Sequence, residues 1–131
     1  MLNIKREAIV IDPSYLYEES APELMNIIEF MATDTKLLSH VRGVDTLPVQ
    51  AFWGEGIYVA KSQDGSSVRE FCVDSGVYCV FDADDFEAIN PGFLNSLNEN
   101  NYARIKTSGD VYRQGSKIMG ALDAGTLSDN N

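Results

Sequence analysis

The stretch from residue 49 to residue 81 constrains the fold most, because short β-type segments alternate there with tight turn signals. The segments are rich in Val, Ile, Tyr, Phe and Trp, and they span 49–53, 57–61, 68–73 and 77–81. Each connection contains glycine; the connections are Gly54-Glu55-Gly56, Gln63-Asp64-Gly65-Ser66 and Asp74-Ser75-Gly76. Short turns of this composition join neighbouring antiparallel strands. The pattern therefore predicts a four-stranded antiparallel meander.

The last of these segments differs from the others because it is wholly apolar and aromatic. Val77-Tyr78-Cys79-Val80-Phe81 has no polar alternate face, so we expect a central strand that is covered on both sides. Residues 7–12 and 102–107 indicate further strands. Behind the apolar segment, Asp82 or Asp84 can cap a short helix, since acids in a first turn suit the helix dipole.

One longer helix is expected near the N-terminus. Ser20-Ala21-Pro22-Glu23 has the residues of a helix start, and Leu24, Ile27, Ile28 and Met31 then repeat at helical spacing. The predicted fold is α+β: an antiparallel meander of four to six strands with the helix of residues 21–32 packed on it. A curled, partly closed barrel is the alternative. The core is expected to include Ile27, Phe52, Tyr78 and Val80.

The chain of 131 residues has the length of one ordinary domain. We assign residues 1–119 to a single globular domain. Residues 120–131, which read GALDAGTLSDNN, are small, polar and glycine-containing, and we expect a flexible C-terminal tail there.

Acidic residues are concentrated in two stretches of the chain. Seven acids and no Lys or Arg lie between Glu7 and Thr35, and the same holds between Glu70 and Ala103. The net charge is −10, which argues against direct binding of nucleic acid and favours a basic protein partner. The predicted partner-binding residues are Asp82, Asp84, Asp85, Glu87, Glu18 and Glu19. Alternatively, the charge only keeps the protein soluble.

The sequence contains few residues that indicate metal binding, catalysis or a disulfide. His40 is the only histidine and is expected on an exposed helix, and no Cys-x-x-Cys motif is present, so no metal site, cofactor or catalytic residue is predicted. Cys72 and Cys79 are expected to be buried thiols rather than a disulfide, although strand geometry could place them opposite each other. No apolar run has the length needed to cross a membrane, and the N-terminus lacks the features of a signal peptide. The expected location is the cytoplasm.

Three short boxes carry a resemblance to known sequences. They are Ile11-Asp12-Pro13-Ser14-Tyr15, Gly54-Glu55-Gly56-Ile57-Tyr58 and Val73-Asp74-Ser75-Gly76. In order and spacing they resemble the DPCY, GDGxY and VD(S/A)G boxes of a loose group of small, uncharacterised bacterial and phage proteins. Ser14 stands for the usual Cys and Glu55 for the usual Asp. The resemblance covers roughly residues 9 to 82 and implies a β-rich fold and a bacterial or phage setting, with no activity to transfer.

These observations lead to one preferred function and two alternatives. The preferred function is a non-enzymatic acidic protein that binds a basic site on a protein partner, for example a phage inhibitor of a host nucleic-acid-binding defence machine, acting in the host cytoplasm. One alternative is a small hydrolase or transferase that uses carboxylates such as Asp12 and Asp74. The other is a structural or assembly protein that forms homo-oligomers through a sheet edge.

Overall fold

A computed structural model describes residues 1–17, 40–51 and 53–126 of the chain. Strands contain 53% of these residues and helical segments 17%. The strands are β1 (Leu2–Ile4), β2 (Glu7–Ile11), β3 (His40–Val41), β4 (Val44–Asp45), β5 (Leu47–Gln50), β6 (Gly56–Ser62), β7 (Val68–Val73), β8 (Val77–Asp82), β9 (Tyr102–Lys106), β10 (Gly109–Gln114), β11 (Lys117–Gly120) and β12 (Leu122–Thr126). The helical segments are α2 (Ala83–Ile89) and the 3-10 turns η1 (Pro13–Tyr15), η2 (Phe93–Ser96) and η3 (Glu99–Asn101).

The fold is mostly β, so the predicted α+β class is wrong. Among the described residues α2 is the one α-helix, and it has seven residues. The predicted helix of residues 21–32 lies outside the described residues, as do Ile27 and Phe52. No helix in the described part of the chain combines the length and the apolar character needed to span a membrane.

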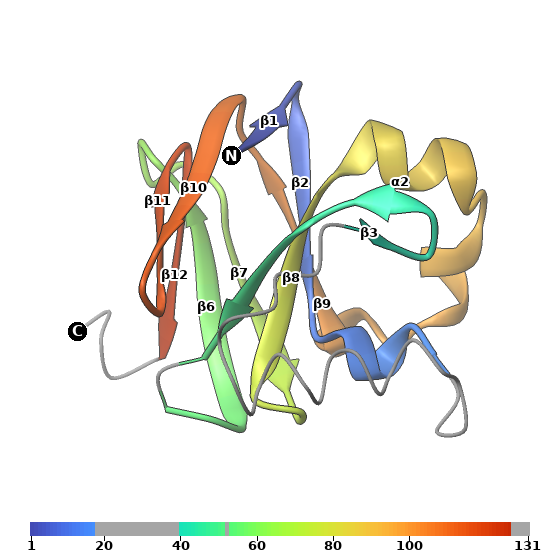
Figure 1. Ribbon diagram of the computed structural model, residues 1–131, viewed down its shortest axis with the longest axis horizontal. Coiled ribbons are helices and arrows are strands. Elements are labelled where there is room, and N and C mark those ends of the chain that lie inside the picture. Colours follow the sequence, from blue (N-terminus) through green and yellow to red (C-terminus); the bar gives the residue numbers. More distant parts are fainter. Residues whose placement is uncertain (18–39, 52, 127–131) are drawn as a thin grey trace.

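The strands form four separate antiparallel sheets rather than one meander (Figure 1). The central sheet has the order β5-β8-β2-β9, and beside it lie β12-β6-β7, β1-β10-β11 and the hairpin β3-β4. Of the predicted neighbours, β6 and β7 do pair, with Tyr58 opposite Phe71. However, β5 pairs with β8 instead of β6, and β7 and β8 belong to different sheets. Neither a single meander nor one sheet curled on itself is therefore present in the described residues.

A buried carboxylate explains why the turn at residues 74–76 does not close a hairpin. Asp12, at the end of β2, is fully buried and accepts hydrogen bonds from the backbone N–H groups of Asp74 and Ser75, both at 2.6 Å. These bonds hold the turn to the end of β2, so the chain crosses there from the outer sheet into the central one. Turn composition alone does not distinguish a hairpin from such a crossing.

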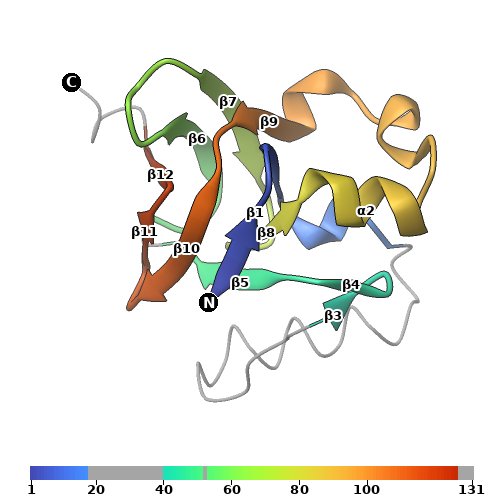
Figure 2. The ribbon, with the colours of Figure 1, turned by 90° about the horizontal axis from the view of Figure 1, so that it is seen from above.

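The central sheet is covered on both faces. Alternate residues of β2 point to opposite sides, so that Ala8 and Val10 join one core and Ile9 and Ile11 join the other. In Figure 2, the two three-stranded outer sheets lie on one side of β8, while α2, the following helical turns and the β3-β4 hairpin lie on the other. All six residues of β8 are buried, which confirms the predicted central, doubly covered strand.

Aromatic rings fill both cores. On the side of the outer sheets, Tyr58, Phe71 and Tyr78 pack with ring centroids 5.5 to 6.0 Å apart. On the helical side, Phe81 packs edge to face against Phe86 of α2, with centroids 5.0 Å apart. Tyr78 and Val80 are buried as predicted.

The C-terminal segment is part of the fold up to residue 126. Leu122–Thr126 form β12, which pairs with β6, and the side chain of Leu122 is fully buried. The prediction of a flexible tail from residue 120 is therefore wrong for residues 120–126, while residues 127–131 lie outside the described residues. A segment of small residues can complete a sheet because its main-chain groups supply the hydrogen bonds.

Candidate functional site

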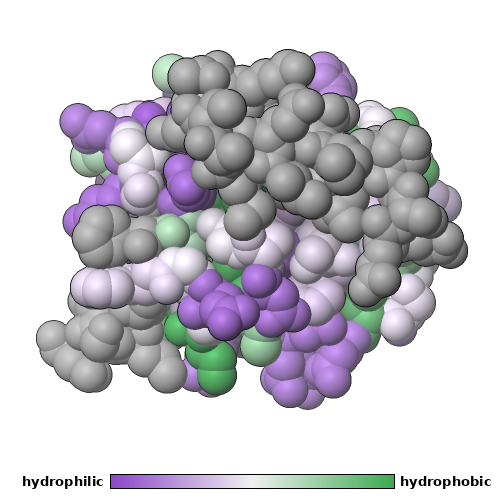
Figure 3. Space-filling view, turned by 60° about the horizontal axis from the view of Figure 1, so that its bottom comes forward, coloured by the Kyte–Doolittle hydropathy of each residue, from purple (hydrophilic) through white to green (hydrophobic). Residues whose placement is uncertain are grey.

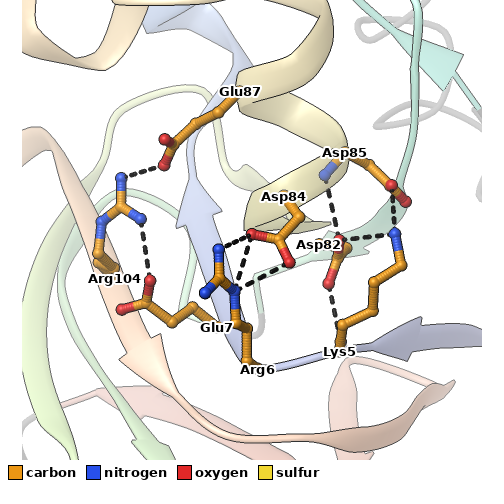
Figure 4. A network of polar contacts seen from close by, with 8 residues as sticks. All are labelled: Lys5, Arg6, Glu7, Asp82, Asp84, Asp85, Glu87 and Arg104. Carbon is orange, nitrogen blue, oxygen red and sulfur yellow. Dashed lines mark hydrogen bonds and ion pairs between the residues drawn. The ribbon is translucent and has the colours of Figure 1, made fainter.

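Most of the predicted partner-binding residues lie at the start of helix α2, directly after β8. The turn between β1 and β2 brings Lys5 and Arg6 to this place, and β9 brings Arg104 (Figure 4). These bases are distant in sequence but close in the fold because β2 lies between β8 and β9 in the central sheet. Glu18 and Glu19, the other two predicted residues, lie outside the described residues.

Asp82 is the buried centre of this cluster, with 1% of its surface exposed. It is the N-cap of α2, one of the two predicted candidates, and accepts a hydrogen bond from the backbone N–H of Asp85 at 3.1 Å. It also accepts one from the backbone N–H of Lys5 at 2.8 Å, and the Lys5 ammonium lies 3.6 Å away. Asp82 thus joins the helix to the β1–β2 turn and is not accessible to a partner.

Asp84 and Asp85 pair with the two bases of the β1–β2 turn. The guanidinium of Arg6 donates to Asp84 from Nε and Nη2 at 2.9 to 3.1 Å, and Lys5 Nζ lies 2.6 Å from Asp85. The hydrogen bond from Arg6 lowers the pKa of Asp84 below its usual value. The hydrogen bond to Asp85 in turn raises the pKa of Lys5.

Arg104 joins the remaining acids of the network. Its Nη1 lies 3.3 Å from the Glu7 carboxylate, and its Nη2 donates to Glu87. The acidic run, which contains no base of its own, is therefore offset in part by bases from other segments of the chain. Only the pairing of β2 with both β8 and β9 could have revealed these partners, since the bases lie far from the run in the sequence.

The network still has more acid than base. It contains five carboxylates and three cationic side chains, so two negative charges are not balanced within it. The side chains of Asp85 and Glu87 are about half exposed, at 49% and 48%, and that of Asp84 is 35% exposed. We call Asp84, Asp85 and Glu87 the α2 acidic rim. Exposed carboxylates of this kind attract and orient cationic groups.

The second pair of carboxylates singled out in the sequence, Asp12 and Asp74, meets at the crossing between sheets. Both oxygens of Asp12 are occupied: Oδ1 accepts from Ser14 N at 2.8 Å and from Ser75 Oγ at 2.7 Å, and Oδ2 accepts from the N–H groups of the turn. The hydroxyl of Tyr15 donates to Asp74. Burial and this bond to Asp74 raise the pKa of Tyr15. The Asp12-Pro13-Ser14-Tyr15 and Val73-Asp74-Ser75-Gly76 boxes thus form one interlocked corner, an arrangement that suits a structural role.

The histidine and the two cysteines are the remaining side chains with potential chemistry. His40 is exposed on strand β3, so its predicted place on a helix is wrong, and its Nε2 lies 2.7 Å from Asp45. Cys72 and Cys79 are both free thiols, on strands of different sheets. Burial raises the pKa of Cys79 to about 12. Among the residues that the structure describes, no group of three or more His, Cys, Asp or Glu side chains could hold a metal ion.

Comparison with known proteins adds no assignment. No family model, no curated protein and no solved structure matches the chain.

Proposed function

We propose that this protein is a non-enzymatic acidic binding protein that engages a basic site on a protein partner, with the α2 acidic rim at the contact. The observation that supports the proposal most is the ionic network around α2. It pairs Lys5, Arg6 and Arg104 with the protein's own carboxylates, keeps two more acids than bases, and leaves the paired carboxylates of the rim partly exposed.

A fourth base, Arg42, also makes its contacts within the protein. Arg42 donates to the backbone oxygen of Leu16 at 2.9 Å and to Asn90 at 3.0 Å, and its guanidinium lies 4.0 Å from the centre of the Phe93 ring. With a net charge of −10 for the whole chain, the six other bases do not offset the excess of acids. Such a field speeds encounter with a basic partner and suppresses encounter with acidic ones.

The basic surfaces that a protein of this charge fits best are those that bind nucleic acid, because exposed carboxylates can occupy the place of phosphates. We therefore favour a bacterial or phage protein that inhibits a nucleic-acid-binding protein of the host, and we assign it to the cytoplasm. The proposal concerns the class of partner, defined by its charge, and not a particular protein.

A pair of matched variants tests the role of the α2 acidic rim. Asp85→Asn with Glu87→Gln removes two charges from the rim, and Glu70→Gln with Asp123→Asn removes two from the exposed positions of β7 and β12. Both double variants have the same net charge, so only the place of the lost charges differs. Binding of an Arg- and Lys-rich peptide, with a Glu-rich peptide as the control ligand, is measured by calorimetry at 50 and 300 mM salt.

We expect the basic peptide to bind at low salt, to weaken strongly at high salt, and to bind the rim variant several-fold more weakly than the control variant. Equal affinities for the two variants would show that only the net charge matters and would remove the rim from the proposal. Failure of any basic peptide to bind would overturn the proposed function. The homo-oligomer alternative predicts salt-resistant self-association instead, which light scattering on the same samples detects.

A further inference from the structure

The loop between β5 and β6 presents the single tryptophan of the chain to solvent. Trp53 is 59% exposed, Ile57 is 51% exposed, and Glu55 between them is exposed as well. Residues 54–58 are also one of the three sequence boxes, and the α2 site makes no use of them. Trp is the side chain that loses most by remaining in water, so its exposure at this position needs an explanation.

A buried tyrosine binds the backbone of Trp53 and Gly54 in this loop. The hydroxyl of Tyr58 donates to the backbone oxygen of Gly54 at 2.8 Å and accepts from the backbone N–H of Trp53 at 3.2 Å. Tyr58 itself is 2% exposed and belongs to the aromatic cluster of the core. Gly54, with φ of 71°, adopts a backbone conformation that other residues rarely adopt. These two bonds tie the backbone of Trp53 and Gly54 to the core, and such anchoring lowers the conformational entropy that is lost on binding.

The exposed groups of this loop suit a cation. An indole face attracts a cationic group electrostatically, and more strongly than other aromatic rings do. Glu55 lies two residues from Trp53 and forms no ion pair with any other residue that the structure describes. A planar guanidinium can stack on an indole and also bond a carboxylate, which an ammonium does less well. The loop therefore matches an arginine better than a lysine.

The loop is separate from the α2 acidic rim. In Figure 1 it lies at the lower end of the view, whereas α2 lies at the upper right. Figure 3 looks toward this lower end, where small hydrophobic areas lie among hydrophilic ones.

We infer that the Trp53–Glu55 loop is a second contact with the partner and binds an arginine side chain, with the guanidinium over the indole and paired with the Glu55 carboxylate. This inference rests on the proposed function in one respect, namely that the partner is basic. It adds a second contact site on the protein and a preference for arginine over lysine, neither of which follows from the α2 acidic rim.

The single tryptophan makes the test direct, because all indole fluorescence of the protein comes from residue 53. The probe is acetyl-Arg-Gly-Arg-Gly-Arg-amide, which has no aromatic residue, with the lysine and citrulline analogues as controls. Binding is followed by Trp53 emission and, independently, by calorimetry. The variants are Trp53→Ala, Trp53→Phe and Glu55→Gln, and Glu70→Gln serves as the control for loss of one charge elsewhere. Circular dichroism verifies that each variant is folded.

We expect a saturable change in Trp53 emission with the midpoint found by calorimetry, weaker binding of the lysine peptide, and none of the citrulline peptide. Trp53→Ala should weaken binding about 2- to 30-fold, with partial recovery in Trp53→Phe, since a phenyl ring is a weaker cation acceptor. Glu55→Gln should weaken binding more than Glu70→Gln does.

The possible failures separate the two proposals. If calorimetry shows binding that the α2 rim variant loses while Trp53 emission and the Trp53→Ala affinity stay unchanged, the loop inference is overturned and the proposed function stands. If the lysine peptide binds as tightly as the arginine peptide, the preference for guanidinium is wrong. If no cationic peptide binds at all, both proposals fail.

Discussion

Replacing Asp12 by asparagine should strongly destabilise the protein, although the side chain keeps its size and shape. The carboxylate is fully buried and accepts four hydrogen bonds of 2.6 to 2.8 Å. Three of the donors are backbone N–H groups, which cannot reverse their polarity. An amide offers one acceptor oxygen and one NH2 group, so at least one backbone N–H must face another donor.

The expected cost follows from these contacts. A buried donor that loses its acceptor costs about 1–3 kcal/mol, and the bonds that remain lose the strength that the negative charge gives them. We therefore expect Asp12→Asn to lower the free energy of unfolding by about 2–4 kcal/mol. This is a large part of the roughly 5–15 kcal/mol that stabilises an ordinary domain.

Urea unfolding at neutral pH measures this quantity. Ser75→Ala is the matched control, because it removes one hydroxyl donor and leaves the carboxylate with its three backbone partners; it should cost only about 1 kcal/mol. Hydrogen exchange at the amides of Asp74 and Ser75 should accelerate in Asp12→Asn before exchange in β8 does. A loss below about 0.5 kcal/mol would refute the conclusion that Asp12 holds the two sheets together at this corner.

Three further predictions follow from the fold and the network. Ending the chain at Gly120 should lower the free energy of unfolding by at least about 3 kcal/mol, because β12 and the buried Leu122 are lost. A chain that ends at Thr126 is the control. An unchanged melting temperature for the shorter chain would show that β12 is dispensable. One thiol, Cys72, should react with a maleimide in the native protein, and Cys79 only after unfolding, because burial keeps the Cys79 thiol protonated; mass spectrometry of the labelled protein counts both. Arg6→Gln should raise the pKa of Asp84, since the Arg6 hydrogen bond holds it low. Because the pKa of Asp84 is lower in the folded than in the unfolded protein, its ionised form stabilises the fold at any pH above the pKa of the unfolded state. This stabilisation is lost as the pH falls through the pKa of the folded state. Carbon NMR titration would contradict the assignment if the Asp84 pKa stayed the same without Arg6.

Local patterns in the sequence identified six of the twelve described strands, but of the predicted pairings only that of β6 with β7 is present. The segments at 57–61, 68–73, 77–81 and 102–107 are strands, because β-branched and aromatic residues bounded by turn signals report on the local conformation of the chain. The partner of a strand depends on contacts distant in the sequence. The turn at 74–76 has the composition of a hairpin, yet the carboxylate of Asp12, 62 residues away, holds it in a crossing between two sheets.

The candidate site shows the same division. The sequence by itself determined that four acids cluster at the end of the most apolar strand and that Asp82 or Asp84 caps the next helix, because capping depends on neighbours within one turn. Only the tertiary structure decided that Lys5, Arg6 and Arg104 meet these acids, since strand pairing across about 75 residues or more brings Lys5 and Arg6 there. It likewise decided that residues 122–126 form a strand with Leu122 buried and that Trp53 stays exposed. Burial depends on what packs against a residue, and the sequence around that residue does not contain this information.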